Sequence, residues 1–341
     1  AGTVTGSRHL LQDGRRSVLL DCGLFQGFKQ LRLRNWSPLP VAPRRLHAVV
    51  LSHAHLDHCG YLPALVRDGY RGPIYATAAT RDLCEILLKD SAHLQEEEAR
   101  FANRHGLSKH MPAEPLYTVE DAARAMKQFR DVDFGERIDL GEGLSASLQP
   151  AGHLLGAGSV RLQRGSRSLL YSGDLGRPND SIMRAPARPQ NTDVLLLEST
   201  YGNRRHGPDG AAELLATTIR EAAAAGGSVL IPSFAVGRAQ TVMLALSRLK
   251  AAGEIPDLPV FLDSPMAIDA TALYRHHRPL HRLTVGECRA MCSVARLINT
   301  PEQSKGLSSL RMPSVIIAAS GMATGGRVLH HLKRLALDER N

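Results

Sequence analysis

The segment VVLSHAHLDHCGYLPAL, Val49 to Leu65, carries four side chains of the kinds that bind metal ions within six consecutive residues. His53 and His55 are two apart, so on an extended segment they point the same way, and Asp57 and His58 form an adjacent pair where a strand turns into a helix. Imidazole and carboxylate groups suit Zn²⁺, and two ions a few ångströms apart need ligands this dense. The alternative to a metal site is a polar strand end whose histidines cap the next helix. A single histidine would favour that alternative, but the pattern H-x-H-x-D-H argues against it.

Two later stretches offer the remaining ligands. QPAGHLLGAGS contains His153, and LLYSGDLGR contains Asp174, each after an apolar run and next to glycine. Alone, the first would fit an ordinary loop histidine and the second a turn aspartate. Together with the first motif, both are predicted to be ligands. Because one carboxylate can bridge two metal ions, we assign that role to Asp174.

The elements that position these residues follow from the apolar pattern. Short apolar runs alternate with longer helical patterns, which predicts an α/β fold. Tight turns separate three consecutive strands in the middle of this region. The expected strands are 17–23, 46–55, 144–153, 158–165, 166–176 and 192–200, and the expected helices are 77–106 and 119–129.

After Tyr201 helical and strand patterns alternate regularly, as in βαβ units, which build a parallel sheet. Ligands gather at the carboxyl ends of the strands in such a sheet. We therefore expect two domains, a β-rich α/β domain at 1–200 and a parallel-sheet domain at 201–341. The expected helices are 210–227, 237–253 and 325–339, and the expected strands are 228–234, 259–265 and 314–321.

The composition is that of an ordinary soluble globular protein with an excess of basic residues. The 341 residues are 43% hydrophobic and 22% charged, which argues against a disordered or fibrous chain. The formal net charge of +9 suits a polyanion such as nucleic acid, although an arginine-rich genome would give the same bias. Five cysteines make no disulfide framework, and no apolar run is long enough to cross a bilayer. We expect a cytoplasmic protein with no membrane partner.

The order of the ligand motifs resembles the metallo-β-lactamase superfamily. H-x-H-x-D-H comes first, G-H follows at His153, and S-G-D follows at Asp174. LDCG with Asp21 is similar to the first conserved motif of that superfamily, whose aspartate orients the metal ligands from behind. The resemblance implies an αββα sandwich. Because the superfamily includes β-lactamases, glyoxalase II, phosphodiesterases and nucleases, the match defines the fold more narrowly than the substrate.

Four later motifs closely resemble the β-CASP nucleases, which include the polyadenylation endonuclease, RNase J and Artemis. These motifs are LLLESTYGNR, IPSFAVGRAQ, FLDSPMA and AASGMATGGR, and the resemblance covers essentially the whole chain. It implies that Glu198 is the acid of β-CASP motif A and that the parallel-sheet region is an inserted β-CASP cap domain. AGHLLGAG and ESTYGNR are more similar to the polyadenylation-endonuclease-like prokaryotic branch, which processes RNA, than to RNase J.

Two turns in the second half offer the donors that a phosphate needs. Ser233 to Arg238 lies where a strand gives way to a helix N-terminus, and Arg238 can pair with phosphate bidentately. Ser320 to Gly326 is a second, glycine-rich turn. Either turn alone would fit an ordinary βα connection, but the two together favour phosphodiester binding. The predicted substrate-binding residues are Ser233, Phe234, Arg238, Ser264, Ser320, Gly321 and Gly325. His330 and His331 are expected on the surface of the last helix.

The resemblance also implies a mechanism with two zinc ions. The implied ligands are His53, His55 and His153 for one ion and Asp57 and His58 for the other, with Asp174 bridging. A hydroxide between the ions would attack phosphorus. Glu198 would act through a hydrogen bond to a histidine that protonates the leaving oxygen. The predicted catalytic residues are therefore Asp57, Asp174 and Glu198.

In the family that histidine belongs to motif C, and motif B supplies one more ligand to the second zinc. Neither motif occurs before Asn341, and the first strand is also missing at the start. We therefore expect a fragment of a longer polypeptide whose second zinc site is short of one ligand and whose turnover is poor.

The leading hypothesis is a zinc-dependent ribonuclease that hydrolyses single-stranded RNA, with self-association as a homodimer left open. A DNA nuclease of the same superfamily is one alternative. The motif C residue normally separates the RNA enzymes of this family from the DNA enzymes. A non-catalytic RNA-binding subunit is another, but such subunits usually lose metal ligands, and every ligand position that can be checked here is filled. A small-substrate hydrolase such as glyoxalase II would not need the cap domain.

Overall fold

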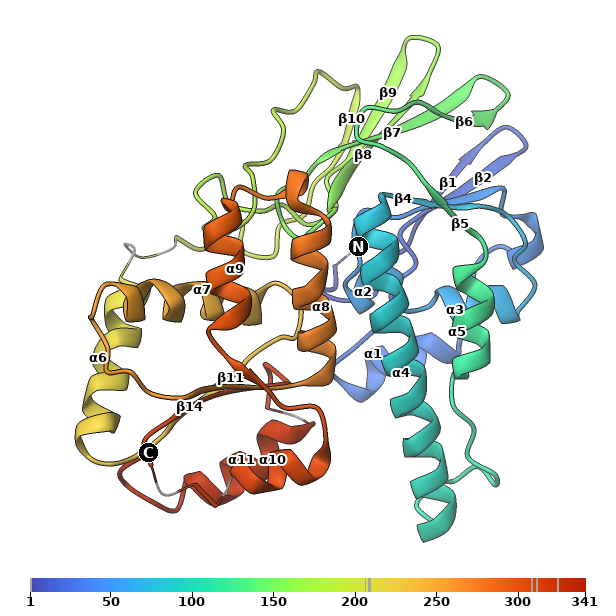
Figure 1. Ribbon diagram of the computed structural model, residues 1–341. Helices are drawn as coiled ribbons and strands as arrows, with labels where there is room; N and C mark the ends of the chain where they lie inside the picture. The colour runs from blue at the N-terminus through green and yellow to red at the C-terminus, as the bar shows by residue number, and fades with distance from the viewer. Residues whose placement is uncertain (1, 206, 208–209, 308, 311, 324) are drawn as a thin grey trace. The chain divides into compact units, whose positions relative to one another are not determined.

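The structure is a computed structural model that describes every residue except 1, 206, 208, 209, 308, 311 and 324. Contacts between residues divide the chain into two compact units, Ala1–Gly202 and Asn203–Asn341 (Figure 1). Each unit combines β-sheet with helices, and each is described by itself below.

Two five-stranded sheets form the framework of the first unit. Their strands are β1 (His9–Asp13), β2 (Arg16–Leu20), β3 (Ala48–Val50), β4 (Ile74–Ala76), β5 (Phe129–Asp131), β6 (Ile138–Gly141), β7 (Leu144–Pro150), β8 (Gly158–Arg164), β9 (Arg167–Tyr171) and β10 (Val194–Leu196). One sheet has the order β1-β2-β3-β4-β5, with β1 and β2 antiparallel and the other pairs parallel. The other has the order β10-β9-β8-β7-β6 and is antiparallel except for the β9–β10 pair.

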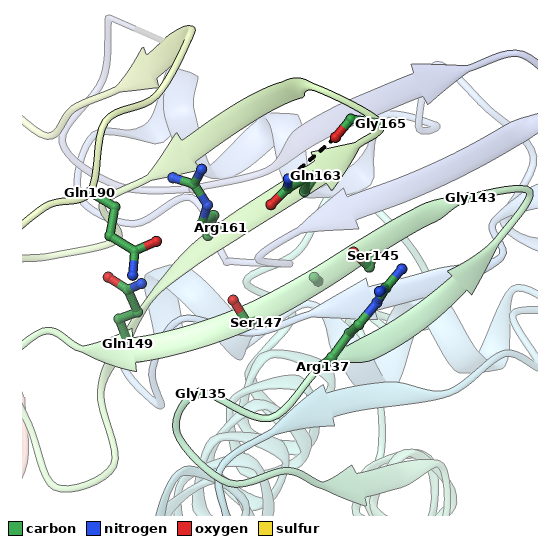
Figure 2. A pocket seen from close by; sticks show the side chains of 11 residues that line it. Gly135, Arg137, Gly143, Ser145, Ser147, Gln149, Arg161, Gln163, Gly165 and Gln190 are labelled. Carbon is green, nitrogen blue, oxygen red and sulfur yellow. Dashed lines mark hydrogen bonds between the residues drawn. The ribbon is translucent and has the colours of Figure 1, made fainter.

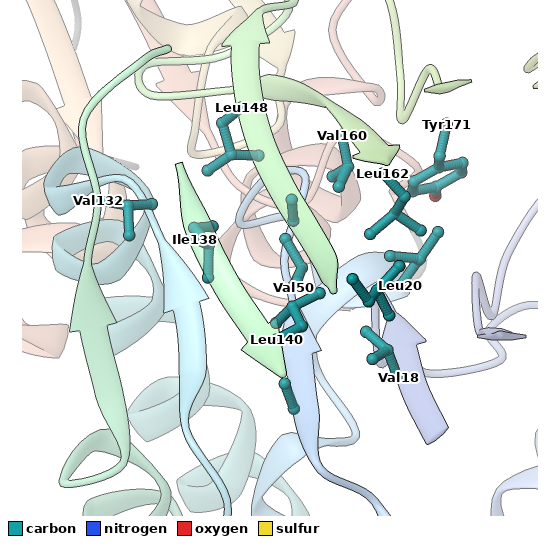
Figure 3. Packing of buried hydrophobic residues seen from close by; sticks show 13 residues of the cluster. Val18, Leu20, Val50, Val132, Ile138, Leu140, Leu148, Val160, Leu162 and Tyr171 are labelled. Atoms are coloured by element: carbon teal, nitrogen blue, oxygen red, sulfur yellow. The ribbon is translucent and has the colours of Figure 1, made fainter. Parts of the chain in front are cut away.

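The two sheets share one apolar core, which Figure 3 shows. Val18 and Leu20 of β2 and Val50 of β3 belong to it, together with Leu148 of β7 and Val160 of β8, and none of these side chains is more than 1% exposed. Burying such side chains is the main force that holds a sandwich together, at about 1.5–3 kcal/mol for each. The core therefore fixes the strand ends from which the polar loops emerge.

The other face of the second sheet is polar over β7 and β8. Because side chains alternate along a strand, Ser147 of β7 and Arg161 of β8 point away from the core. With Arg137 they border a hollow of about 450 Å³ (Figure 2). Its lining contains two arginines and no histidine or acidic residue, so this hollow has no ligands to offer a metal ion.

The helices of the first unit include one long element, α4. Its N-cap Thr77 accepts a hydrogen bond from the Thr80 N–H, and Gly106 ends it in the left-handed conformation, so the predicted helix at 77–106 is confirmed. The helices are α1 (Lys29–Leu33), α2 (Leu56–Cys59), α3 (Leu62–Arg67), α4 (Ala78–His105) and α5 (Val119–Met126), with 3₁₀ turns at Arg34–Trp36 and Pro43–Arg45.

The second unit is built on a parallel sheet of order β11-β14-β12-β13, as the βαβ pattern predicts. Its strands are β11 (Val229–Pro232), β12 (Val260–Asp263), β13 (Arg296–Leu297) and β14 (Val315–Ala318). Its helices are α6 (Ala211–Ala224), α7 (Arg238–Ala251), α8 (Pro265–His276), α9 (Val285–Ser293), α10 (Pro301–Leu307) and α11 (Arg327–Leu335), with a 3₁₀ turn at Arg278–Leu280. None of the helices in the described part of the chain has the length and apolar character that a membrane span requires.

Several local expectations differ from the structure. The strands expected at 17–23, 144–153, 166–176 and 192–200 are shorter and end at Leu20, Pro150, Tyr171 and Leu196. The strand expected at 46–55 ends at Val50, because the Ser52 N–H donates to Asp21 Oδ1 at 2.6 Å instead of continuing the sheet. The segment that carries the first histidines is therefore a loop. The expectation that His331 lies on a helix surface is wrong, since this side chain is 1% exposed and its Nε2 lies 2.6 Å from Asp263 Oδ2. Its neighbour His330 is exposed.

Candidate metal centre

Ligand-type side chains from three loops of the first unit converge at the ends of β3, β7 and β9. Two of these loops touch, since the Gly176 N–H donates to the Ala151 carbonyl at 2.8 Å. A Cβ atom at position 176 would lie 1.8 Å from the carbonyl oxygen of Gly152, so only glycine allows this approach. The contact brings the loop of Asp174 against the loop of His153.

Four side chains form the first donor group. His55 Nδ1 lies 3.1 Å from His53 Nε2 and 3.2 Å from His153 Nε2. With one oxygen of Asp174, these ligand atoms all lie within 4.8 Å of one another. Two nitrogens bound to one zinc at about 2.0 Å in a tetrahedral arrangement would be about 3.3 Å apart. The three imidazoles thus fit a single zinc ion.

The Asp174 carboxylate also faces a second donor group. Its Oδ2 lies 3.7 Å from His53 Nε2 and 3.6 Å from His153 Nε2. Its Oδ1 lies 3.2 Å from His58 Nε2, which is in turn 3.8 Å from Asp57 Oδ2. The two oxygens of one carboxylate therefore point to two different groups of ligands, which is the arrangement that a bridge between two ions requires.

Asp21 holds the second group from behind. It is fully buried, and one of its oxygens lies 2.6 Å from His58 Nδ1, so the Nε2 of that ring is left to face Asp174. The carboxylate also accepts hydrogen bonds from the Ser52 N–H, the Ser52 hydroxyl and the Tyr171 hydroxyl at 2.6–2.7 Å. The sequence predicts neither Ser52 nor Tyr171, although each directly precedes a ligand motif. Their position next to those motifs was the available signal.

The electrostatics of the centre suit a bound cation. Burial lowers the pKa of His53, His55 and His153, for His55 to about 3, so these rings are neutral and keep free lone pairs at neutral pH. Burial acts in the same direction on His58, but the carboxylates of Asp21 and Asp174 outweigh it and raise the pKa of His58 well above its ordinary value. When no metal ion is bound, a proton on His58 supplies the positive charge that the Asp21 and Asp174 carboxylates favour.

Glu198 lies just after β10 and is partly exposed. Its N–H donates to Ser172 Oγ at 2.9 Å, and its Oε2 accepts a hydrogen bond from the Thr200 N–H at 3.0 Å. Its charge acts on His153, where it favours the protonated ring against the effect of burial. The structure thus places this acid near the first donor group but not in it.

In the second unit, the loops expected to bind phosphate lie side by side. β11 and β14 are neighbours, and the Ser233 N–H donates to the Ala318 carbonyl at 3.0 Å. A Cβ atom at Gly321 would lie 2.8 Å from the Phe234 nitrogen, so the two turns are in close contact. Residue 324, in the second turn, lies outside the described residues.

The predicted substrate-binding side chains divide into exposed and buried ones. Phe234 and Arg238 are exposed, whereas Ser233 and Ser264 are buried. Ser264 Oγ accepts a hydrogen bond from the Ala267 N–H and caps α8, and Ser233 Oγ donates to the backbone next to it. The exposed pair can reach a ligand directly, while the two serines shape the turns. Ser320, Gly321 and Gly325 lie in the second turn and are partly exposed.

A two-sheet sandwich with a histidine–aspartate centre at its loops is the architecture of a metal-dependent hydrolase. The model of the metallo-beta-lactamase superfamily matches residues 2–233, and that of the Beta-Casp domain matches residues 239–341. The chain belongs to the β-CASP nucleases, a family of metal-dependent enzymes within the metallo-β-lactamase superfamily. The predicted family and fold class are thus confirmed.

Two similar proteins support this assignment, and one solved structure supports the fold. Ribonuclease TTHA0252 of Thermus thermophilus is 40% identical over 355 residues, which cover 100% of this chain and 76% of that protein. Transcription termination factor FttA of Methanocaldococcus jannaschii is 32% identical over 340 residues, which cover 95% of this chain and 51% of that protein. The crystal structure of a protein of unknown function from Enterococcus faecalis V583 matches with a TM-score of 0.50 at 16% identity, covering 93% of this chain and 75% of that one, and shows the fold alone.

Proposed function

We propose that this chain is a zinc-dependent ribonuclease that hydrolyses phosphodiester bonds of single-stranded RNA. The observation that carries the proposal is the Asp174 carboxylate, with one oxygen toward His53 and His153 and the other toward His58. Two ions a few ångströms apart are a common arrangement for phosphodiester hydrolysis. The 40% identity to a ribonuclease and the net charge of +9 support RNA as the substrate.

The residues of the centre would divide the work as follows. The proposed ligands are His53, His55 and His153 for one zinc and Asp57 and His58 for the other, with Asp174 bridging. Bound zinc supplies Lewis acidity and acidifies a water molecule that can attack phosphorus. Asp21 keeps the proton of His58 on Nδ1, so that Nε2 can serve as a ligand. Glu198 would hold the group that protonates the leaving oxygen.

The remaining assignments are proposals of the same kind. We assign residues 1–200 to the metallo-β-lactamase domain and 201–341 to the β-CASP cap, and the two compact units support this division. The exposed Phe234 would stack on a base, and the exposed Arg238 would pair with a phosphate. A cytoplasmic location is supported by the five unpaired cysteines, because thiols remain reduced there.

A second candidate is a role in transcription termination, which the 32% identity to FttA favours. The chain spans about half the length of that protein. To propose the activity of a whole termination factor is therefore to propose more than RNA cleavage. Both candidates require the same metal centre. They differ in whether transcribing RNA polymerase is needed, and release of transcripts from stalled complexes would distinguish them.

Cleavage of labelled single-stranded RNA and of the matching single-stranded DNA by the full-length protein, with zinc and with a chelator, tests the first candidate. We expect cutting of RNA only, and only with metal present. His153→Ala should lose both bound zinc and cleavage. His93→Ala is the matched control, because His93 is exposed on α4 and lies outside the donor groups. Equal cutting of both nucleic acids, or cutting in the chelator, would contradict the proposal.

A further inference from the structure

The segment between Asp21 and Asp57 contains no acidic residue at all. Its five cations are all exposed, and they are Lys29, Arg32, Arg34, Arg44 and Arg45. Among the residues that the structure describes, none of the five makes a salt bridge. In a chain with 33 acidic residues, so long a stretch of uncompensated positive charge is a distinct surface feature. It gives this part of the first unit a positive potential.

Large apolar side chains are exposed among these cations. Phe28 is 82% exposed, Leu33 55%, and Trp36, the single tryptophan of the chain, 59%. Phe28 is the N-cap of α1, Leu33 ends this helix, and Trp36 ends the 3₁₀ turn that continues it (Figure 1). The Arg32 N–H donates to the Phe28 carbonyl at 3.1 Å, so these two residues are neighbours on one face of the turn. We call residues 28–36 the Phe28–Trp36 surface.

The Phe28–Trp36 surface is anchored to the fold through Asn35. Asn35 is 7% exposed, and its side-chain oxygen accepts a hydrogen bond from the Phe25 N–H at 2.9 Å, while its amide donates to the Phe25 carbonyl at 2.8 Å. Arg8 donates to the same oxygen and lies 5.1 Å from the Phe25 ring centroid. An ordered aromatic surface loses little conformational entropy when a ligand binds.

The same anchors place this surface close to the metal centre. Leu24, next to Phe25, donates its N–H to the Leu56 carbonyl at 2.8 Å, and Leu56 begins α2, the helix that carries two of the proposed ligands. Phe28 is three residues beyond Phe25, a span of at most about 10 Å. Trp36 is the residue after the Asn35 that is bonded to Phe25. Both exposed aromatic residues therefore lie within a short reach of the centre.

We infer that the Phe28–Trp36 surface binds the single-stranded RNA substrate beside the metal centre, with bases stacked on Phe28 and Trp36 and phosphates paired with Lys29, Arg32 and Arg34. Exposed aromatic side chains among exposed cations are the surface chemistry that binds single strands without sequence preference. An apolar protein partner would not need the cations, and a folded acidic one would not need the flat rings. The inference rests on the proposed function, because RNA is the substrate proposed there.

Trp36 makes the inference directly measurable, since no other tryptophan of the 341 residues contributes fluorescence. Titration of the chain with an unlabelled single-stranded RNA of about 12 nucleotides, in chelator to prevent cleavage, should quench this fluorescence as a base stacks on the indole ring. Trp36→Ala and Phe28→Ala should each weaken binding of a dye-labelled RNA about 10-fold, and Trp36→Phe should restore most of the loss. Arg32→Gln should weaken binding and reduce the slope of log Kd against log salt by about 0.7.

Phe101→Ala is the matched control. Phe101 is 56% exposed on α4 of the same unit, but it follows the acidic run Glu96 to Glu98. This variant should bind RNA like the original chain. Thermal unfolding of every variant should also be unchanged, because the substituted side chains are exposed.

The outcomes separate this inference from the proposed function. Metal-dependent RNA cleavage with no quenching and normal binding by Phe28→Ala and Trp36→Ala would overturn the inference and leave the proposed function intact. The same result with loss of binding to a protein partner would assign the surface to protein instead. Normal RNA quenching with no cleavage of any RNA by the full-length protein would overturn the proposed function and leave the binding surface.

Discussion

Each of the two units contains a buried aspartate paired with a buried histidine. The two pairs differ in the surroundings of the second ring nitrogen of the histidine. In the first unit His58 Nδ1 lies 2.6 Å from Asp21, and in the second His331 Nε2 lies 2.6 Å from Asp263. The free nitrogen of His58 faces a second carboxylate, that of Asp174, at 3.2 Å. The free nitrogen of His331 is buried without a hydrogen-bond partner.

The surroundings of the two aspartates explain the difference. Asp263 also accepts hydrogen bonds from Arg327 at 2.7 Å and from Ser304 at 2.5 Å, so its charge is neutralised within the fold. Asp21 accepts its other bonds from Ser52 and Tyr171, which bring no charge. The first pair therefore supports a site that still attracts a cation, whereas the second is a closed structural clamp. The same two residue types serve opposite purposes.

Asp174→Asn should have the largest effect of any change to the first pair's surroundings. An amide cannot supply two anionic oxygens to two ions, so we expect loss of one bound zinc and a fall in RNA cleavage of about 10³-fold, equivalent to about 4 kcal/mol. Metal content by mass spectrometry and single-turnover cleavage would measure this. Retention of two zinc ions with normal cleavage would remove Asp174 from the centre.

Asp263→Asn should chiefly destabilise the second unit. It removes the counter-charge of a partly buried Arg327 and a strong acceptor for His331, which we expect to cost about 3 kcal/mol of unfolding free energy. Denaturant unfolding followed by circular dichroism would measure it. Zinc content should not change, and a loss of zinc as large as that of Asp174→Asn would contradict the contrast between the two pairs.

The stability due to Asp263 should depend on pH in a defined sense. Burial alone would raise the pKa of this carboxyl, but the hydrogen bonds that it accepts, first of all from His331, lower it below its usual range. A lowered pKa in the folded state contributes stability that is present above the unfolded pKa of about 3.9 and is lost as the pH falls through the folded pKa. The gap between the original chain and Asp263→Asn should therefore be constant near neutral pH and shrink below about pH 4. A constant gap down to pH 2 would show that charge is not the cause.

Asp21→Asn should weaken metal binding without abolishing it. Residues that orient a ligand from behind typically change metal affinity by 10–100-fold. We expect an effect in this range on zinc, because the amide can still bond to His58 but no longer favours its Nδ1–H tautomer. Competition with a zinc chelator of known affinity would measure the change. Tyr171→Phe, which removes one hydrogen bond to the same carboxylate, should give a smaller shift in the same direction.

The sequence reveals the surroundings of the Asp21–His58 pair far better than it reveals the Asp263–His331 pair. His53, His55, Asp57 and His58 lie close together in sequence because one short segment carries all four, and His153 and Asp174 each follow an apolar strand. Asp263 and His331 are 68 residues apart, so only the folded sheet brings them together. Local patterns therefore predict the fold class and the ligand set.

Contacts that depend on three-dimensional packing cannot be predicted from local sequence patterns. Ser52 and Tyr171 carry ordinary side chains with many uses, and their shared bond to Asp21 exists only once β2, β3 and β9 are in place. The end of β3 at Val50 has the same origin, because the Ser52 N–H turns from the sheet toward Asp21.

Adjacent histidines in α11 provide the smallest and sharpest test of the comparison. His331 shares a helix face with Val328, three residues earlier, and both are buried, whereas His330 points outward and is exposed. His331→Ala should lose a hydrogen bond to a charged group and leave a cavity, at a cost of about 2 kcal/mol in unfolding free energy. His330→Ala should change it by less than about 0.5 kcal/mol. Equal effects at the two positions would mean that the closed pair contributes nothing to the stability of the second unit, and the contrast with the metal centre would then rest on geometry alone.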